Sequence, residues 1–172
     1  MNPYKYQSLN ILTPSGRIKR AQSYIDNFRD AYIVFAKYSS WNIDDIPPLE
    51  YDFSIRLLPE TIVYKKVFSI EIIEENLCSI KNNIHIFDSY IQTDNIKKTK
   101  VLIKTKLYRE DLNGNSFRMI GLHTNLISNR VNSDSIFEED ILYHGNLEWF
   151  SISTPLDLFE ELYREINIVL QF

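Results

Sequence analysis

Three histidines, His85, His123 and His144, are the side chains of this sequence best suited to proton transfer or metal binding near neutral pH. They are well separated along the chain, and none belongs to an H-E-x-x-H motif, in which two imidazoles on one helix face bind zinc. His85 and His123 fall within segments that are expected to be β-strands. A strand histidine without a neighbouring partner is usually structural, although separation in sequence leaves open a cluster in space.

Cys78 is the only cysteine and therefore the only candidate thiol nucleophile. A reactive thiol needs electropositive surroundings, but Glu74 and Glu75 lie shortly before Cys78. We therefore expect Cys78 to be a small buried apolar residue. A single cysteine also excludes a disulfide within the chain and argues against a cysteine-based zinc site, which fits a reducing compartment.

Carboxylates occur as adjacent pairs, a pattern that raises the question of acid–base catalysis or metal binding. The pairs are Asp44-Asp45, Glu74-Glu75, Glu138-Glu139 and Glu160-Glu161. Neighbouring side chains point in different directions, whereas a glycosidase needs two carboxyls about 5–10 Å apart across a cleft. The first pair lacks the spacing of a calcium loop, and no serine lies in a G-x-S-x-G motif. We therefore expect a protein that is not an enzyme and that has no cofactor and no metal.

The net charge of −4 at pH 7 provides no positive field for nucleic acid or for a membrane surface, so neither is expected as a partner. Basic clusters at 17–20 and 97–100 lie among polar residues and are expected to be solvated. Only four glycines occur, which argues against a phosphate-binding loop. No apolar segment has the length of a signal peptide core or a membrane span, so synthesis in a cytoplasm is expected.

The 172 residues, 44% of them hydrophobic, are expected to form a single domain, 1–172, with its own core. Residues 15–30 show helical periodicity and predict an amphipathic helix with Ser15 as a plausible N-cap. Its apolar stripe is Ile18, Ala21, Ile25 and Phe28. Residues 31–38 are apolar on both faces and predict a strand that is covered on both sides. The following loop, 39–61, contains three prolines and cannot be a regular central strand.

Strand patterns continue from residue 62 to the C-terminus, with a short helix allowed near 135–143. Residues 100–125 predict a β-hairpin, because Asn113-Gly114 favours a tight turn with positive φ at both residues. Further strands are expected at 147–153 and 166–172. Strands without regularly interposed helices indicate a mainly β (α+β) fold: an antiparallel β-sandwich with one N-terminal amphipathic helix and room for a second short one.

Three sequence blocks carry a resemblance to a known family. The first runs from Arg17 and Lys19-Arg20 through the helix and strand to Trp41, Asp44-Asp45 and Pro47-Pro48. The second is "FRMIGLHTN", residues 117–125, and the third is the terminal "EINIVLQF", which ends at Phe172. In these blocks the chain resembles the baseplate wedge subunit of T-even-type contractile-tailed phages, the gene product eight family. The chain is much shorter than that subunit, so the resemblance is to a short version without its insertions.

The resemblance implies a structural subunit of the phage virion, in the wedge or periphery of the contractile tail baseplate. It implies assembly with other baseplate and tail proteins, a homodimer, and a possible tail-fibre attachment. It also marks candidate interface or family-motif positions. These are Phe35, Lys37, Trp41, Pro47, Pro48, Phe117, Arg118, Asn125, Trp149 and Phe172. The loop from Trp41 to Pro48 is a candidate docking surface; the alternative, that Trp41 caps the core, stays open.

Two other functions fit the same features. One is a different virion assembly protein, such as a neck or tail-completion subunit, which shares the size and β-rich content. The other is a fibre-adaptor or glycan-binding module, which needs exposed aromatic side chains on one rim. Trp41 and Trp149 are the candidates for that rim.

Overall fold

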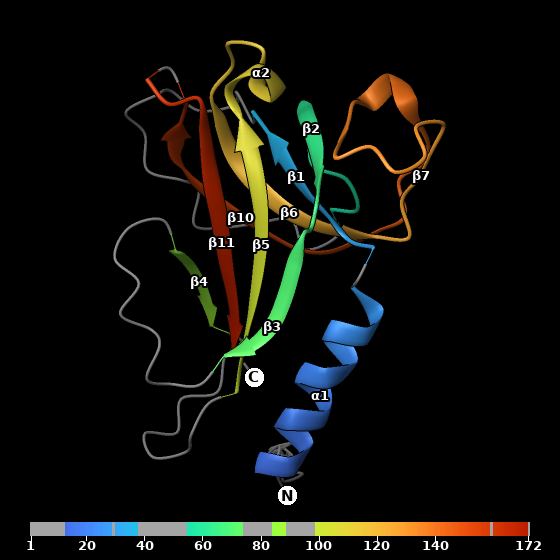
Figure 1. Cartoon of the computed structure of the whole chain (residues 1–172), viewed down its shortest axis with the longest axis vertical. Helices are drawn as coiled ribbons and strands as arrows, with labels where there is room; N and C mark the ends of the chain where they lie inside the picture. The colour runs from blue at the N-terminus through green and yellow to red at the C-terminus, as the bar shows by residue number, and fades with distance from the viewer. Residues whose placement is uncertain are drawn as a thin grey trace, which may run out of the picture.

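The computed structural model describes residues 13–28, 30–37, 55–73, 84–88, 99–158 and 160–171. Within these residues the protein is mainly β with antiparallel sheets and one main helix, as predicted (Figure 1). The helices are α1 (Pro14–Asn27) and α2 (Arg109–Leu112), and a 3₁₀ turn spans Glu138–Asp140. The strands are β1 (Tyr32–Ala36), β2 (Thr61–Lys66), β3 (Ser69–Ile73), β4 (Ile84–Asp88), β5 (Lys100–Tyr108), β6 (Phe117–Thr124), β7 (Ile127–Ser128), β8 (Ser135–Ile136), β9 (Ile141–Tyr143), β10 (Asn146–Leu156) and β11 (Tyr163–Gln171).

The strands form three sheets. A five-stranded sheet has the order β10-β6-β1-β2-β8, and a four-stranded sheet has the order β3-β5-β11-β4. Strands β7 and β9 form a separate two-stranded ribbon. Every described pairing is antiparallel except that of β11 with β4, which is parallel. The strand expected at 166–172 is present as β11, which lies inside its sheet between β5 and β4.

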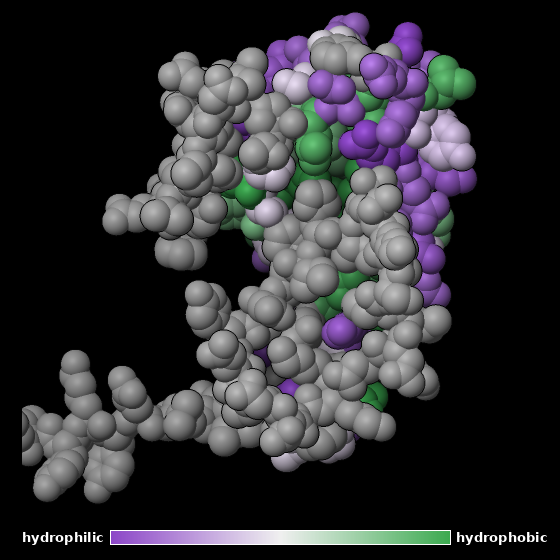
Figure 2. Space-filling model, turned by 90° about the vertical axis from the view of Figure 1, so that its left-hand side faces the viewer, coloured by the Kyte–Doolittle hydropathy of each residue, from purple (hydrophilic) through white to green (hydrophobic). Residues whose placement is uncertain are grey.

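The main core lies between the five-stranded and four-stranded sheets. It joins Ile33 and Phe117 of one sheet to Ile103 and Ile168 of the other, all fully buried. A second core covers the opposite face of the five-stranded sheet, where Val34 and Met119 contribute. Strand β1 is therefore buried along its whole length, which confirms that it is covered on both sides. Seen from the left-hand side of Figure 1, apolar side chains reach the surface between polar ones (Figure 2).

Helix α1 packs one side on the main core through Ala21 and Phe28. Its N-cap is Thr13, whose hydroxyl accepts a hydrogen bond from the Gly16 amide at 3.2 Å, so the prediction of Ser15 as the cap was wrong. Pro14 occupies the first turn, where its missing N–H has no intrahelical partner to lose. The helix ends at Asn27 rather than 30, and Ile18 is 55% exposed rather than part of the buried stripe.

The predicted hairpin at 100–125 is wrong in its pairing, although its strands and turn exist. Strand β5 pairs with β3 and β11, whereas β6 pairs with β1 and β10. Asn113 and Gly114 do have positive φ, 47° and 74°, but the turn leads from one sheet to the other. The reason is the core: β5 and β6 place apolar side chains on its opposite sides, which one hairpin sheet cannot do.

A similar crossing between sheets interrupts the strand pattern that begins at residue 62. Strand β2 lies in the five-stranded sheet and β3 in the four-stranded sheet, with a break at Val67 and Phe68. The short helix expected at 135–143 is reduced to the 3₁₀ turn, and α2 takes the place of a second helix. Among the described helices, none has both the length and the apolar character needed to cross a bilayer.

Candidate functional site

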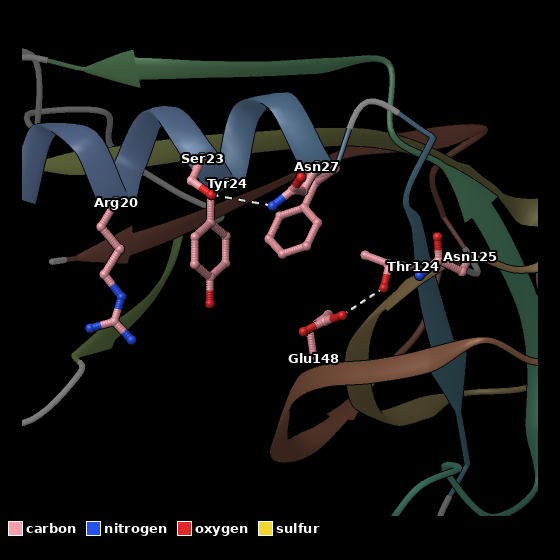
Figure 3. Close-up of a pocket in the computed structure, with 8 residues that line it drawn as sticks. Arg20, Ser23, Tyr24, Asn27, Thr124, Asn125 and Glu148 are labelled. Atoms are coloured by element: carbon pink, nitrogen blue, oxygen red, sulfur yellow. Dashed lines mark hydrogen bonds between the residues drawn. The ribbon is translucent and has the colours of Figure 1, made fainter.

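A polar pocket of about 430 Å³ lies between α1 and the adjoining ends of β6 and β10 (Figure 3). It is lined by side chains of α1, of the end of β6 and of β10. These are Arg20, Ser23, Tyr24, Asn27, Phe28, Thr124, Asn125 and Glu148. Hydroxyls, amides, one guanidinium and one carboxylate thus face a common space.

Helix α1 forms one wall of the pocket, because the spacing of its polar residues puts them on one face. Arg20, Tyr24 and Asn27 follow one another at intervals of four and three residues, so one helix face presents them together. The Asn27 amide donates a hydrogen bond of 3.2 Å to the Ser23 hydroxyl, which fixes the end of this wall. The pocket wall therefore lies beside the face that carries Ala21 into the core.

The strands contribute the opposite wall. The Thr124 hydroxyl donates to a Glu148 carboxylate oxygen at 2.6 Å, and Thr124 itself is buried. Asn125 follows β6 with φ of 57°, a left-handed conformation that asparagine adopts more readily than most residues. This backbone conformation takes the chain out of the sheet and leaves the Asn125 side chain exposed at the pocket.

Opposite charges act on the Tyr24 phenol in the pocket. Burial raises the pKa of Tyr24, the Arg20 guanidinium lowers it, and the Glu148 carboxylate raises it. Figure 3 shows Tyr24 between Arg20 and Glu148. A pocket with donors on one wall and a carboxylate on the other suits a ligand that has both acceptors and donors, such as a polypeptide segment.

The structure brings together two blocks that the sequence had singled out. Arg20 belongs to the helix block, and Thr124-Asn125 closes the "FRMIGLHTN" block. Asn125 is thus the predicted position that lines the pocket. Glu148 was not predicted, and its only signal was its place beside Trp149 in a strand.

The other predicted positions lie elsewhere. Phe35 and Phe117 are fully buried in the main core, where their rings meet edge to face with centroids 5.0 Å apart. Arg118 is buried, and Lys37 is half-buried with its amide bonded to the Glu60 carbonyl at 3.1 Å. Trp149 is half-buried and packs against the main core, so it does not form an exposed rim. Outside the described residues lie Trp41, Pro47, Pro48 and Phe172.

Two of the histidines meet around a buried tyrosine. The Tyr64 hydroxyl lies 3.2 Å from Nδ1 of His144, whose Nε2 lies 3.3 Å from a Glu138 carboxylate oxygen. Nδ1 of His123 lies 2.9 Å from the His144 carbonyl oxygen, so Nδ1 must carry the proton of this bond. The His123 ring also meets Tyr64 edge to face. Among the described residues, no group of three or more His, Cys, Asp or Glu side chains is arranged to hold a metal ion.

Mild acid is expected to weaken the fold through His123. Burial lowers the pKa of His123 below its ordinary value of 6.5, and the hydrogen bond to His144 offsets this only in part. Its contribution to stability is therefore complete above about pH 6.5 and is lost as pH falls through the lower folded pKa. Urea unfolding from about pH 7.5 to about pH 5 should show this decline, and His123→Gln should reduce it. If the stability of His123→Gln falls with pH as steeply as that of the unsubstituted protein, the assignment to His123 is contradicted.

Comparison with known proteins places the chain among the structural proteins of the phage tail baseplate. A family model described as "Baseplate wedge 3 tail fiber network component" matches residues 9–172, and the chain belongs to that family. It is also similar to "Virion protein 3" of Enterococcus phage phiEF24C, with 26% identity over 151 residues that cover 81% of this chain and 82% of that protein. The expected class of phage baseplate protein, and its place in the virion, are thereby confirmed.

Proposed function

We propose that this chain is a non-catalytic subunit of the wedge or periphery of a contractile tail baseplate, made in the host cytoplasm and working by assembly with other tail proteins. The observation that carries the proposal is the family match, which extends over residues 9–172. The finer features come from the resemblance to the gene product eight family: a short form of that subunit, a homodimer, and a contact with tail fibres.

The pocket is the proposed docking point for a segment of a neighbouring tail protein. Its support is that side chains from two separate sequence blocks, Arg20 and Thr124-Asn125, line one space together with Glu148. The hydrogen bonds between Ser23 and Asn27 and between Thr124 and Glu148 hold both walls before a partner binds. Walls that are already ordered reduce the conformational entropy lost on docking.

Removing the polar groups of the pocket is expected to weaken capture of tail proteins. In Asn125→Gly the backbone can keep positive φ while the amide is lost, and in Glu148→Gln the charge is lost with little change in shape. Each change should weaken binding about tenfold, the effect of losing about one hydrogen bond or its charge assistance. The measurement is affinity for each purified baseplate and tail protein of the same phage.

The matched control is Gln22→Ala on an exposed part of α1, where the Gln22 amide bonds Asp26. Control and pocket variants should have equal helix content and equal unfolding midpoints. Equal binding by control and pocket variants would contradict the role of the pocket.

A homodimer predicts a solution mass of twice 20.4 kDa, measured by light scattering. Location of the chain at the neck of an intact virion would contradict the baseplate assignment.

A further inference from the structure

The ribbon of β7 and β9 exposes an unusual amount of apolar surface. It stands beside the five-stranded sheet and is labelled β7 in Figure 1. Four large apolar side chains between residues 127 and 143 are 54% to 83% exposed. They are Ile127, Val131, Leu142 and Tyr143. A cluster of exposed apolar side chains on one element marks an interaction site, whereas single exposed ones do not.

The exposed apolar side chains of the two strands lie close together. Ile127 pairs with Tyr143 across the two strands, so these side chains share one face. Leu142 is the extra residue at an irregularity of the pairing, because Ile127 and Ser128 pair with Tyr143 and Ile141. Apolar side chains that project from a narrow ribbon are buried most fully in a recess, because a flat partner would leave their sides in water.

The ribbon is fixed before any partner binds. The Arg130 guanidinium pairs with the Asp140 carboxylate at 2.8 Å, and the Asn129 amide donates to the Asp140 carbonyl at 3.0 Å. Asp140 is buried, and the neighbouring Ile141 packs on the second core. The contact between Tyr64 and His144 adds a further anchor beside β9. Little backbone freedom therefore remains to be lost when the ribbon docks.

Charge indicates the kind of partner. The segment from 126 to 145 carries four carboxylates and one guanidinium. The carboxylates belong to Asp134, Glu138, Glu139 and Asp140, and the guanidinium belongs to Arg130. Asp134, Glu138 and Glu139 are exposed, and Glu138 also lies 3.3 Å from Nε2 of His144. Arg130 and Asp140 pair with each other. The apolar ribbon thus has an acidic rim.

We propose that the ribbon inserts into an apolar recess, rimmed by Lys or Arg, on a different protein of the tail. A second copy of this chain is the poorer occupant, because a twofold contact would place the same acidic rims against each other. This inference rests on the proposed function, since the partner is taken from the same assembly.

The test uses the full chain and each purified baseplate and tail protein of the same phage. The double variant Ile127→Ser with Tyr143→Ser should weaken binding to one of these proteins at least about a hundredfold, as expected when two buried anchors are lost. Glu139→Lys should weaken it about tenfold and reduce its dependence on salt. The control is Leu162→Ser, since Leu162 is 79% exposed but lies just before β11 of the four-stranded sheet, outside the ribbon. This control should bind normally.

Crosslinking identifies the occupant and separates the outcomes. With p-benzoylphenylalanine in place of Tyr143, crosslinks should reach a basic segment of that partner, and in place of Tyr163 they should not. Binding of a tail protein that is indifferent to the ribbon variants would overturn this inference and leave the proposed function standing. Binding of no tail protein would overturn both. Crosslinks from position 143 to a second copy, with loss of the dimer in the double variant, would also overturn it.

Discussion

Replacing Asp111 by alanine is expected to lower the free energy of unfolding by about 3–5 kcal/mol, because it leaves a buried ammonium group without its counter-ion. The Lys65 and Asp111 side chains are 3% and 7% exposed, and their charged atoms lie 2.8 Å apart. Lys65 sits in β2 within a buried stretch of the strand. Water cannot readily replace the lost carboxylate there.

The Asp111 carboxylate also organises the neutral groups around it. It accepts a hydrogen bond from the Ser135 hydroxyl at 2.6 Å and another from the Tyr108 amide at 2.8 Å. Lys65 in turn donates to the Ser135 hydroxyl at 2.5 Å, and its Nζ lies 5.1 Å from the centre of the Tyr108 ring. The network therefore joins β2 and β8 of one sheet to the end of β5 in the other. Its loss should loosen both sheets at this end.

An exposed ion pair of equal length provides the control. Lys104 and Glu71 also lie 2.8 Å apart, but their side chains are 27% and 49% exposed. Glu71→Ala should cost less than about 1 kcal/mol. The measurement is urea unfolding with the slope checked for two-state behaviour. The double change Lys65→Met with Asp111→Leu should restore much of the stability, because it removes both charges. If Asp111→Ala and Glu71→Ala cost the same, the buried network contributes no more than a surface pair.

The faces of individual strands could be read from the sequence, but their neighbours could not. The alternation in residues 100–108 puts Val101, Ile103, Thr105 and Leu107 on one face, because side chains alternate along any strand, and these four residues are buried. The same alternation is compatible with either sheet. The sequence therefore predicted a hairpin from β5 to β6, whereas the core divides these strands between two sheets.

The candidate site could be predicted from the sequence only in part, for a related reason. Asn125 and Arg20 belong to motifs that the sequence singled out, but their meeting at one pocket depends on how α1 packs beside β6 and β10. Glu148 alternates with half-buried neighbours like any solvent-facing residue of a strand. The burial of Lys65 could not be predicted either, because a lysine in an apolar strand usually marks an exposed position. Its buried partner Asp111 lies far along the chain.

Replacing Gly145 by alanine is expected to cost about 4 kcal/mol or more, a loss that single substitutions cause only through severe packing or backbone conflicts. Gly145 has φ of 70°, and a Cβ there would overlap the Thr124 carbonyl oxygen and lie 2.7 Å from the Asn125 carbonyl carbon. Those backbone atoms cannot move freely, because Thr124 is buried and pairs with Asn146 in the β6–β10 register.

The cost at Gly145 has two causes, the left-handed backbone conformation and the overlap of a Cβ with backbone atoms, and Gly114 separates them. Its φ of 74° is nearly the same, but a Cβ at that position would meet nothing within 4 Å. Gly114→Ala should therefore cost only about 1–2 kcal/mol, the penalty of a left-handed conformation for an L-residue. Urea unfolding of the two variants measures the difference directly. Equal costs would mean that the backbone around Gly145 shifts to accommodate the added Cβ.

The corner at Gly145 also connects the two proposed surfaces. It lies between β9 of the ribbon and β10, and its close neighbours Thr124 and Asn125 line the pocket. If Gly145→Ala is folded at low temperature, it should therefore weaken binding at both the pocket and the ribbon. Gly114→Ala, in the turn between β5 and β6, should leave both intact. Weakened binding at one surface alone would mean that the corner does not set the position of both.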